Sequence, residues 1–223
     1  MPHYLVSLLG VLLVNSALNV TMGAEISASL SYATDYTVLG ISRSQGEGVF
    51  QGGLNLDTES GFYASLWASQ VEYSVVSSNP DTGNPNTNYP YTDYPTDYQD
   101  ERDLELDLYL GYRQAIAPGW RSEIMLAHYT YPGATSTRDW AYTELLLAMH
   151  YRNRASVALG ISKNLFGRSQ LTRSLAVNTR LFTWQGVTGS AGAGYVDAAA
   201  LPAGYAYWQA AVARQFGAVR TSL

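Results

Sequence analysis

The 223-residue chain contains no cysteine, which excludes disulfide bonds, thiolate metal sites and a cysteine nucleophile. Charged residues are scarce too: they form 14% of the chain, whereas soluble domains have about 25%. The net charge is -5, and no basic face of the kind that a nucleic-acid-binding protein needs is visible. Aromatic residues, in contrast, reach 13% and include 18 tyrosines, which argues against intrinsic disorder.

Long apolar runs are missing as well. After the first 14 residues, no run approaches the roughly 20 residues that a membrane-spanning helix needs. The run from Leu5 to Val14 has the length of a signal-peptide core, and the small residues Gly23 and Ala24 follow it. We therefore predict that residues 1–24 are a signal peptide and that residues 25–223 form one domain. A buried N-terminal strand is the alternative interpretation of the same run.

Strict alternation of apolar and polar residues is the main pattern after Ala24, and it is typical of β-strands. It is clearest in DLELDLYLGY at 103–112. One face of this strand would carry Leu104, Leu106, Leu108 and Leu110, and the other Asp103, Glu105 and Asp107. A helix of this sequence would mix the two sets around its circumference.

The same alternation recurs along the chain and predicts an all-β protein without a helix. Its strands are expected at 25–34, 47–57, 60–73, 102–113, 119–131, 140–152, 154–163, 172–184, 188–196, 205–216 and in a short segment from residue 218. Short connections alternate with long ones, among them 39–46. The longest, 74–101, is rich in Asn, Pro, Asp and Tyr and is predicted to be a loop.

Two architectures fit such a chain: a soluble sandwich or lipocalin-like barrel, and an outer-membrane barrel whose apolar faces contact lipid. The predicted export signal and the alternation of short turns with long loops favour the second. Aromatic residues near the strand ends, and Gly, Ala and Ser beside charges on the polar faces, favour it too. We therefore predict an antiparallel outer-membrane β-barrel.

Several segments resemble the proteobacterial porins called TorF-type. They are TDYTVLGISRS at 34–44, VFQGGLNLDTESGFYASLWAS at 49–69, LELDLYLGY at 104–112, YTYPG at 129–133 and YTELLLAM at 142–149. The resemblance implies an outer-membrane β-barrel and supplies no catalytic residues. The chain departs from the family pattern at Leu39, where the family usually has arginine, and has an arginine at Arg43 instead.

The C-terminal end departs as well. The family's barrel normally continues through two strands to an aromatic terminus, whereas this chain stops at Leu223. A closed barrel is expected to have an even number of strands. We therefore expect a plan of about 12 strands whose C-terminal hairpin is truncated here, which would leave the segment from residue 218 as an unpaired edge.

The polar faces supply the candidate functional residues, which are expected to line the lumen. They are Asp103, Glu105, Asp107, Arg113, Arg121, Glu144, Asn178 and Arg180, and Glu123 is a further candidate. Arg121 and Glu123 are the weaker members because the phase of their strand is ambiguous. The carboxylates could form a constriction that favours cations. Alternatively, they could be held by Arg113, Arg121 and Arg180 in a structural network that plugs the barrel.

No catalytic residue, metal site or cofactor site is predicted. His128 and His150, the histidines after the predicted signal peptide, have no readable nucleophile or acidic partner in the sequence. The carboxylates of loop 74–101 could hold Ca²⁺ loosely, but a solvated acidic loop explains them as well. We do not expect an enzyme.

The function expected from the sequence is passive diffusion of small polar or cationic solutes through a porin-like channel in the bacterial outer membrane. The expected partners are the lipid bilayer with lipopolysaccharide, the barrel-assembly machinery and the solutes, and the oligomeric state stays open. The alternative function is a non-conducting structural or adhesive barrel that interacts through its extracellular loops, chiefly 74–101.

Overall fold

The computed structural model describes residues 6–8, 11–20, 23–73, 101–133, 140–165, 169–199, 203–216 and 219–222. Their strands are β1 (Val6–Leu8), β2 (Val11–Val20), β3 (Ala24–Ala33), β4 (Tyr36–Val38), β5 (Ile41–Ser42), β6 (Val49–Thr58), β7 (Phe62–Tyr73), β8 (Glu101–Ala117), β9 (Trp120–Thr130), β10 (Tyr142–Tyr151), β11 (Ala155–Ser162), β12 (Thr172–Trp184), β13 (Val187–Ala198), β14 (Tyr205–Phe216) and β15 (Val219–Ser222). Within these ranges no helix is long and apolar enough to cross a membrane.

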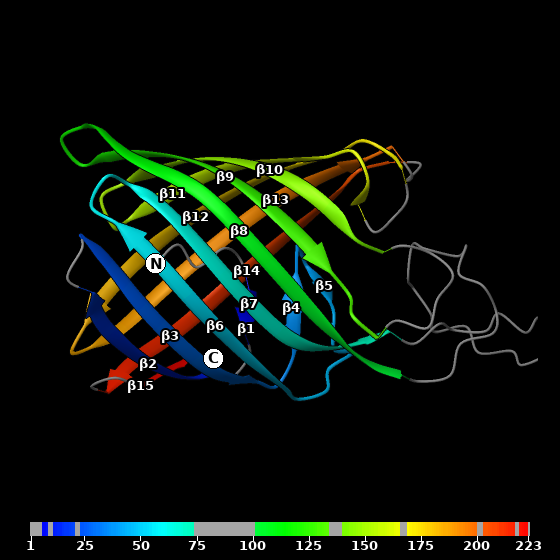
Figure 1. The fold of residues 1–223 in the computed structure, drawn as a ribbon, viewed down its shortest axis with the longest axis horizontal. Helices are drawn as coiled ribbons and strands as arrows, with labels where there is room; N and C mark the ends of the chain where they lie inside the picture. Colours follow the sequence, from blue (N-terminus) through cyan, green and yellow to red (C-terminus); the bar gives the residue numbers. More distant parts are fainter. Residues whose placement is uncertain are drawn as a thin grey trace, which may run out of the picture.

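Twelve of the strands form one antiparallel ring (Figure 1). Around it, each strand from β6 to β14 pairs with its neighbours along the chain, and β3 pairs with β6. Strand β15 pairs with β14 and β2, and β2 pairs with β3, which closes the ring. The prediction of an antiparallel all-β fold is confirmed, and two strands, 172–184 and 205–216, have the predicted bounds.

The predicted unpaired edge at the C-terminal segment is not found. Strand β15 lies between β14 and β2, and β2 consists of residues that the sequence assigned to a signal peptide. Ten residues suffice both for a signal-peptide core and for a barrel strand, so length alone did not separate the two. The signal peptide stays a prediction. Cleavage after Gly23 or Ala24 would remove β2, so this processing and the β2 pairing exclude one another.

The two ends of the ring differ in their connections, as Figure 1 shows. Two-residue turns such as 118–119 and 185–186 lie at one end, where Gly119 and Gly186 adopt positive φ angles of 81° and 78°. The connection 34–48 and the described residues 131–133, 140–141, 163–165 and 169–171 of two further connections lie at the other end. Strand β7 ends there at Tyr73 and β8 begins there at Glu101, and residues 74–100 of the predicted loop 74–101 lie outside the described part of the chain.

The connection between β3 and β6, residues 34–48, turns into the ring; we call it the inner segment. The sequence predicted only a loop over 39–46, whereas the structure places β4 and β5 here, in a small sheet with β1 (Figure 1). Arg43 of the inner segment contacts Glu105 on β8, and a Cβ at Gly40 would lie 2.6 Å from Cβ of Tyr207 on β14. Because β8 and β14 are six places apart in the ring of twelve, the inner segment spans its interior.

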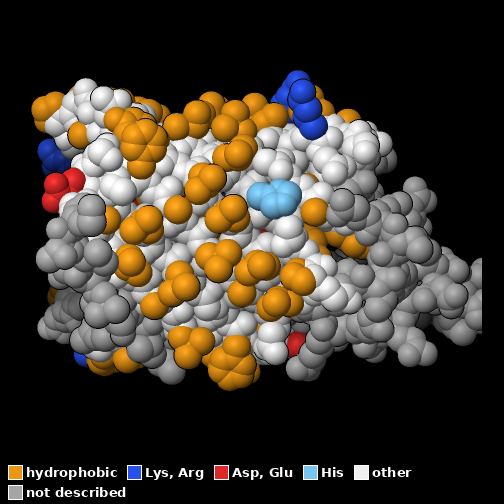
Figure 2. Space-filling model, in the orientation of Figure 1, with side chains coloured by type: hydrophobic (Ala, Val, Ile, Leu, Met, Phe, Trp, Pro, Cys, Tyr) orange, Lys and Arg blue, Asp and Glu red, His pale blue; other side chains and the backbone are white. Residues whose placement is uncertain are grey.

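Apolar side chains cover the outside of the ring, while polar ones are buried within it. Large hydrophobic side chains are exposed on every strand of the ring from β6 to β14, as Figure 2 illustrates for one face. On β9, Leu126 is 47% exposed and the next residue, Ala127, is fully buried. The most completely buried side chains include Glu105 and Asp107. This distribution is the reverse of that in a water-soluble protein.

Two single-cysteine variants on β9 test which residues of this strand face outward and which face inward. The natural chain has no thiol that would react as well. Leu126→Cys should react with an apolar maleimide in detergent roughly ten times faster or more than Ala127→Cys, since reactivity follows exposure. The readout is the labelling rate by mass spectrometry, with both variants labelled equally after denaturation as the control. Equal rates in the folded protein would contradict the phase.

Candidate functional site

Two clusters of polar side chains occupy the interior of the ring. The first, which we call the Glu105 cluster, comprises Tyr36, Arg43, Glu105, Asp107, Tyr109 and Tyr131. The second, the Glu123 cluster, comprises Asp57, Tyr63, Arg113, Glu123 and His150. The Glu105 cluster lies toward the end with the long connections. The Glu123 cluster lies toward the end with the two-residue turns.

In the Glu105 cluster the inner segment supplies donors to a carboxylate of the barrel wall. The Tyr36 hydroxyl donates to Glu105 Oε1 at 2.7 Å, and Arg43 Nη2 lies 3.4 Å from Glu105 Oε2. The same Arg43 nitrogen donates to the Tyr131 hydroxyl at 2.9 Å. The exposed fraction of Glu105 is 1%, so these contacts replace the water that a carboxylate otherwise requires.

Asp107 follows two residues later on the same face of β8 and is also fully buried. The Tyr109 hydroxyl donates to its Oδ2 at 2.5 Å. The other carboxylate oxygen, Oδ1, is buried and has no hydrogen-bond partner. Two inward carboxylates therefore meet one guanidinium in this cluster, and burial makes the remaining negative charge costly unless a cation or a proton balances it.

Aromatic rings surround these carboxylates. Trp67 on β7 and Tyr129 on β9 are the cross-strand partners of Asp107 on either side. The Trp67 ring packs against Tyr36 with centroids 5.2 Å apart, and the Tyr129 ring stacks on Tyr142 at 4.3 Å. Each tyrosine or tryptophan presents a negative ring face, so together with the carboxylates they make this part of the interior attractive to cations.

Local hydrogen bonds hold the inner segment in shape. Asp35 Oδ1 accepts from the hydroxyls of Ser42 and Ser44 at 2.5 and 3.0 Å. Ser44 Oγ accepts from the Tyr36 amide at 2.9 Å, which ties the two sides of the segment together. Gly46 follows in a left-handed conformation with φ of 83°. These bonds position Tyr36 and Arg43 independently of the barrel wall that they contact.

The Glu123 cluster is centred on one buried carboxylate, whose partners include an arginine, a tyrosine and a histidine. Arg113 Nε donates to Glu123 Oε1 at 3.1 Å, and the Tyr63 hydroxyl donates to the same oxygen at 2.5 Å. His150 Nε2 lies 2.9 Å from Oε2. Arg113 Nη1 also donates to Asp57 Oδ1 at 2.8 Å. The Arg113 carbon Cζ lies 3.7 Å from the centre of the Tyr63 ring, so a cation–π contact adds to the ion pairs.

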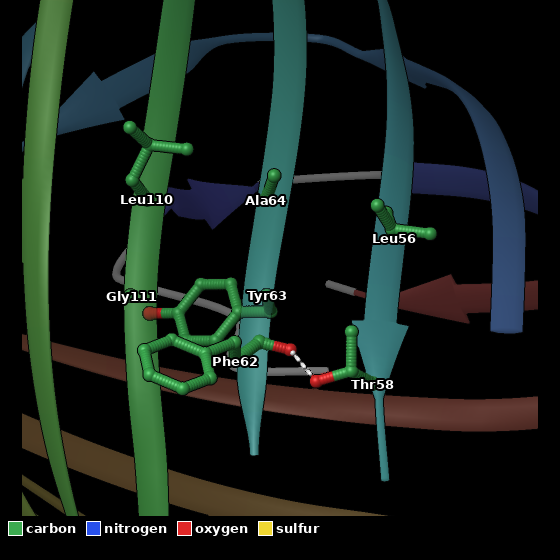
Figure 3. A pocket seen from close by; sticks show the side chains of 7 residues that line it. All are labelled: Leu56, Thr58, Phe62, Tyr63, Ala64, Leu110 and Gly111. Carbon is green, nitrogen blue, oxygen red and sulfur yellow. Dashed lines mark hydrogen bonds between the residues drawn. The ribbon is translucent and has the colours of Figure 1, made fainter. Parts of the chain in front are cut away.

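Glycine makes room for two of the inward side chains. A Cβ at Gly111 would lie 2.3 Å from Tyr63 Cζ, so only glycine lets this ring cross β8 toward Glu123. The neighbouring β7 and β8 backbones are drawn in Figure 3. A Cβ at Gly160 would likewise lie 2.3 Å from Glu144 Oε1. Because the glycines lie on strands adjacent to those of the side chains, they shape the interior without donating any group to it.

The wall formed by β11 to β13 is built from small neutral residues at its inward positions. Inward positions of β11 to β13 carry Ala158, Ala176, Ser190, Gly192 and Gly194. Across them Gln209 Nε2 donates to Asn178 Oδ1 at 2.9 Å. The interior is therefore asymmetric: the clusters of carboxylates and arginines lie on β6 to β10 and the inner segment, whereas β11 to β13 present small neutral groups.

The predicted lumen residues fall into different places. Glu105, Asp107 and Arg113 belong to the two clusters, and Glu144 and Asn178 face inward outside them. Arg121 and Arg180 lie exposed near the end with the two-residue turns and form no ion pair with any described carboxylate. The expected network of carboxylates with three arginines is therefore wrong for these two. The side chain of Asp103 lies outside the described residues.

Sequence reasoning missed the partner that Glu105 has. Arg43 lies in a predicted loop and stands 62 positions away from Glu105, so no periodicity connects them. It was noticed only as a departure from the TorF-type pattern. Tyr36 was missed for the same reason, and Glu123 was underrated because of its ambiguous strand phase. Only the inward turn of residues 34–48 brings Tyr36 and Arg43 to Glu105.

The histidines His128 and His150 lie on opposite faces of the barrel wall. His128 lies on the outer face, where Nδ1 is 2.9 Å from Thr143 Oγ1. His150 contacts Glu123 as described. In the part of the chain that the structure describes, no group of three or more His, Asp or Glu side chains could hold a metal ion.

A shallow groove of about 270 Å³ lies on the outer face between β6, β7 and β8 (Figure 3). Ala64 is the cross-strand neighbour of Leu56 and Leu110, and its small side chain leaves the hollow between them. Phe62 closes one end, and its carbonyl accepts from Thr58 Oγ1 at 2.8 Å. The groove is apolar and carries no charged group, so it adds nothing to the chemistry of the interior.

A model of one protein family matches residues 17–221, nearly the whole chain. Its description is "Bacterial protein of unknown function (Gcw_chp)". The chain belongs to this family. No curated protein matches the chain. No solved structure matches it either. The family has no assigned function, so the likeness to TorF-type porins stays a resemblance.

Removal of the Glu123 carboxylate should destabilise the fold. Glu123→Ala would remove the buried carboxylate that accepts from Arg113 Nε, and breaking such a buried pair costs about 3–5 kcal/mol. Glu123→Gln should cost less because an amide oxygen still accepts from Tyr63. The free energy of unfolding in urea is the measurement. Glu59→Ala, in an exposed turn, is the matched control and should stay within about 0.5 kcal/mol of the natural protein.

Proposed function

We propose that this protein is an outer-membrane β-barrel that acts as a porin-like channel for small polar or cationic solutes. The observation that carries the proposal is the reversed distribution of side chains: exposed Leu, Ile, Val and Phe around the ring, and buried Glu105, Asp107 and Glu123 inside it. A lipid bilayer is the environment that stabilises such an exterior.

Aromatic pairs near the ends of the strands support the membrane location. Phe62 packs on Tyr112 and Trp120 on Tyr151 at the end with the two-residue turns. Tyr32 packs on Phe50 near the opposite end. Tyrosine and tryptophan favour the interface between lipid and water, where outer-membrane barrels carry two girdles of aromatic residues.

The interior suits cations more than anions. Its buried carboxylates and the rings around them lie along β7 to β10, next to the neutral wall of β11 to β13, and Asp107 has no cationic partner within hydrogen-bond distance. Fixed negative charge in a narrow passage concentrates cations and excludes anions. In this proposal the partners are the bilayer with lipopolysaccharide, the barrel-assembly machinery and the solute.

The inner segment favours a second function, a barrel that does not conduct. It spans the ring from Glu105 to Tyr207, and Tyr36, Arg43 and Ser44 are buried in the interior. If this segment stays in place, the protein would serve as a structural or adhesive barrel that interacts through its extracellular loops. Conduction by the folded protein distinguishes the two functions.

Ion selectivity is the direct test of the channel. The full chain, refolded and inserted in planar bilayers under a KCl gradient, should show a reversal potential on the cation side. The double variant Glu105→Gln/Asp107→Asn should move it toward zero because the fixed charge is lost. High salt should act likewise, since the screening length falls to about 3 Å at 1 M. Glu59→Gln is the matched control.

Folded protein without current across many insertions would contradict the channel and leave the structural function. Anion preference in the natural chain would contradict the role of the carboxylates.

Contact with lipid has its own test on β9. Leu126 lies near the middle of this strand between Leu110 and Leu145 of the adjacent strands. In liposomes, Leu126→Arg should lower the free energy of unfolding by about 2–4 kcal/mol if the position is at mid-bilayer. Trp120→Arg, at the strand end, should cost only about 0–1 kcal/mol. Equal small costs at both positions would argue against a bilayer around the ring.

A further inference from the structure

Arg43 reveals which cation the Glu105 cluster accommodates. Its guanidinium lies between the Glu105 carboxylate and the Tyr131 hydroxyl, and its Cζ is 6.0 Å from the centre of the Tyr131 ring. Carboxylate, phenol oxygen and ring face are the three kinds of group that recognise a planar guanidinium. The groups on the barrel wall therefore form a site, and the inner segment supplies its occupant from within the same chain.

The contact between Arg43 and Glu105 is longer than an optimal ion pair. The Nη2 to Oε2 distance of 3.4 Å exceeds the 2.7–2.9 Å usual for charge-assisted hydrogen bonds. Arg43 is constrained by the turns of the inner segment, where Leu39 and Gln45 both adopt positive φ angles. A free guanidinium has no such constraint and can align both of its nitrogens with the carboxylate.

Asp107 provides an independent reason to expect a cationic ligand. Its Oδ1 is fully buried and accepts no hydrogen bond, although Tyr109 satisfies Oδ2. Glu105 and Asp107 lie two residues apart on one strand face, about 7 Å along it. Trp67 and Tyr129 flank Asp107 as cross-strand partners, so a cation between the two carboxylates would also meet aromatic rings.

We propose that the Glu105 cluster is a binding site for small solutes that carry a guanidinium group, for which Arg43 is the tethered competitor. This inference rests on the proposed channel function, because it names the solute class that the channel would accept. A tethered group of this kind competes at an effective concentration in the millimolar range. The solute should therefore bind the natural protein at millimolar concentrations and bind more tightly when Arg43 is removed.

Binding is tested first in detergent, where no channel activity is needed. Methylguanidinium is titrated into the full-length Arg43→Ala variant by calorimetry, and methylammonium at equal ionic strength is the comparison. The dissociation constant for methylguanidinium should be at least about tenfold lower than that for methylammonium, because only a planar guanidinium can donate to the carboxylate through two nitrogens. Methylguanidinium at the concentrations of this titration should also raise the unfolding temperature of the Arg43→Ala variant.

Two variants control for unspecific effects. Arg173→Ala removes an exposed arginine whose Nη1 lies 4.0 Å from Asp197, and it should show no gain in methylguanidinium binding. Arg43→Ala/Glu105→Gln lacks the carboxylate that the ligand needs and should lose the binding. Arg43→Gln replaces Arg43→Ala if the latter does not refold. Binding that persists without Glu105, or equal binding of both cations, would overturn the proposed site.

Permeation is measured separately in planar bilayers, with methylguanidinium on one side and methylammonium on the other. The natural protein should favour methylguanidinium, and Glu105→Gln/Asp107→Asn should lose this preference. Binding without any current would support the site and contradict the channel. Cation current without preference, in a protein that binds neither probe selectively, would support the channel and contradict the site.

Discussion

The structure depends on one constraint: every second residue of its strands points into a narrow closed ring, and most charged groups there must find partners within it. Most outward residues are apolar, and they point away from the inward carboxylates. Glu123 therefore has Arg113, His150 and Tyr63, and Glu105 has Arg43 and Tyr36. Buried charges without such partners would oppose folding by several kcal/mol each.

The two clusters meet this constraint in different ways. Tyr63, Arg113 and His150, which contact Glu123, belong to the barrel strands β7, β8 and β10, so the ring itself supplies the Glu123 cluster with these partners. The partners of Glu105 come from the inner segment, which has its own bracing through Asp35 and Ser44. A carboxylate whose partner lies on a separate segment can exchange that partner for a ligand. A carboxylate whose partners lie on the barrel strands cannot do so unless hydrogen bonds between the strands break. This difference is why the candidate site lies at Glu105.

The functional proposal follows from this arrangement and not from similarity. The Gcw_chp family match places the chain among bacterial proteins without an assigned function. The reversed exterior supports a membrane location, and the acidic, aromatic side of the interior supports a preference for cations. The inner segment is the feature on which channel and structural barrel differ, because it determines whether the polar interior is continuous from end to end.

Strand alternation by itself determined the all-β fold class, the approximate positions of the strands β3 and β6 to β15, and the phase of β8, with Leu104, Leu108 and Leu110 outward and Glu105 and Asp107 inward. These follow from a period of two residues, which needs only local sequence. The ring closure through β2 and the inward turn of residues 34–48 required the tertiary structure. So did the pairing of Glu105 with Arg43. Each of these joins residues that are far apart in the chain, and contacts over such separations depend on how the strands wind around the ring, which no local pattern encodes.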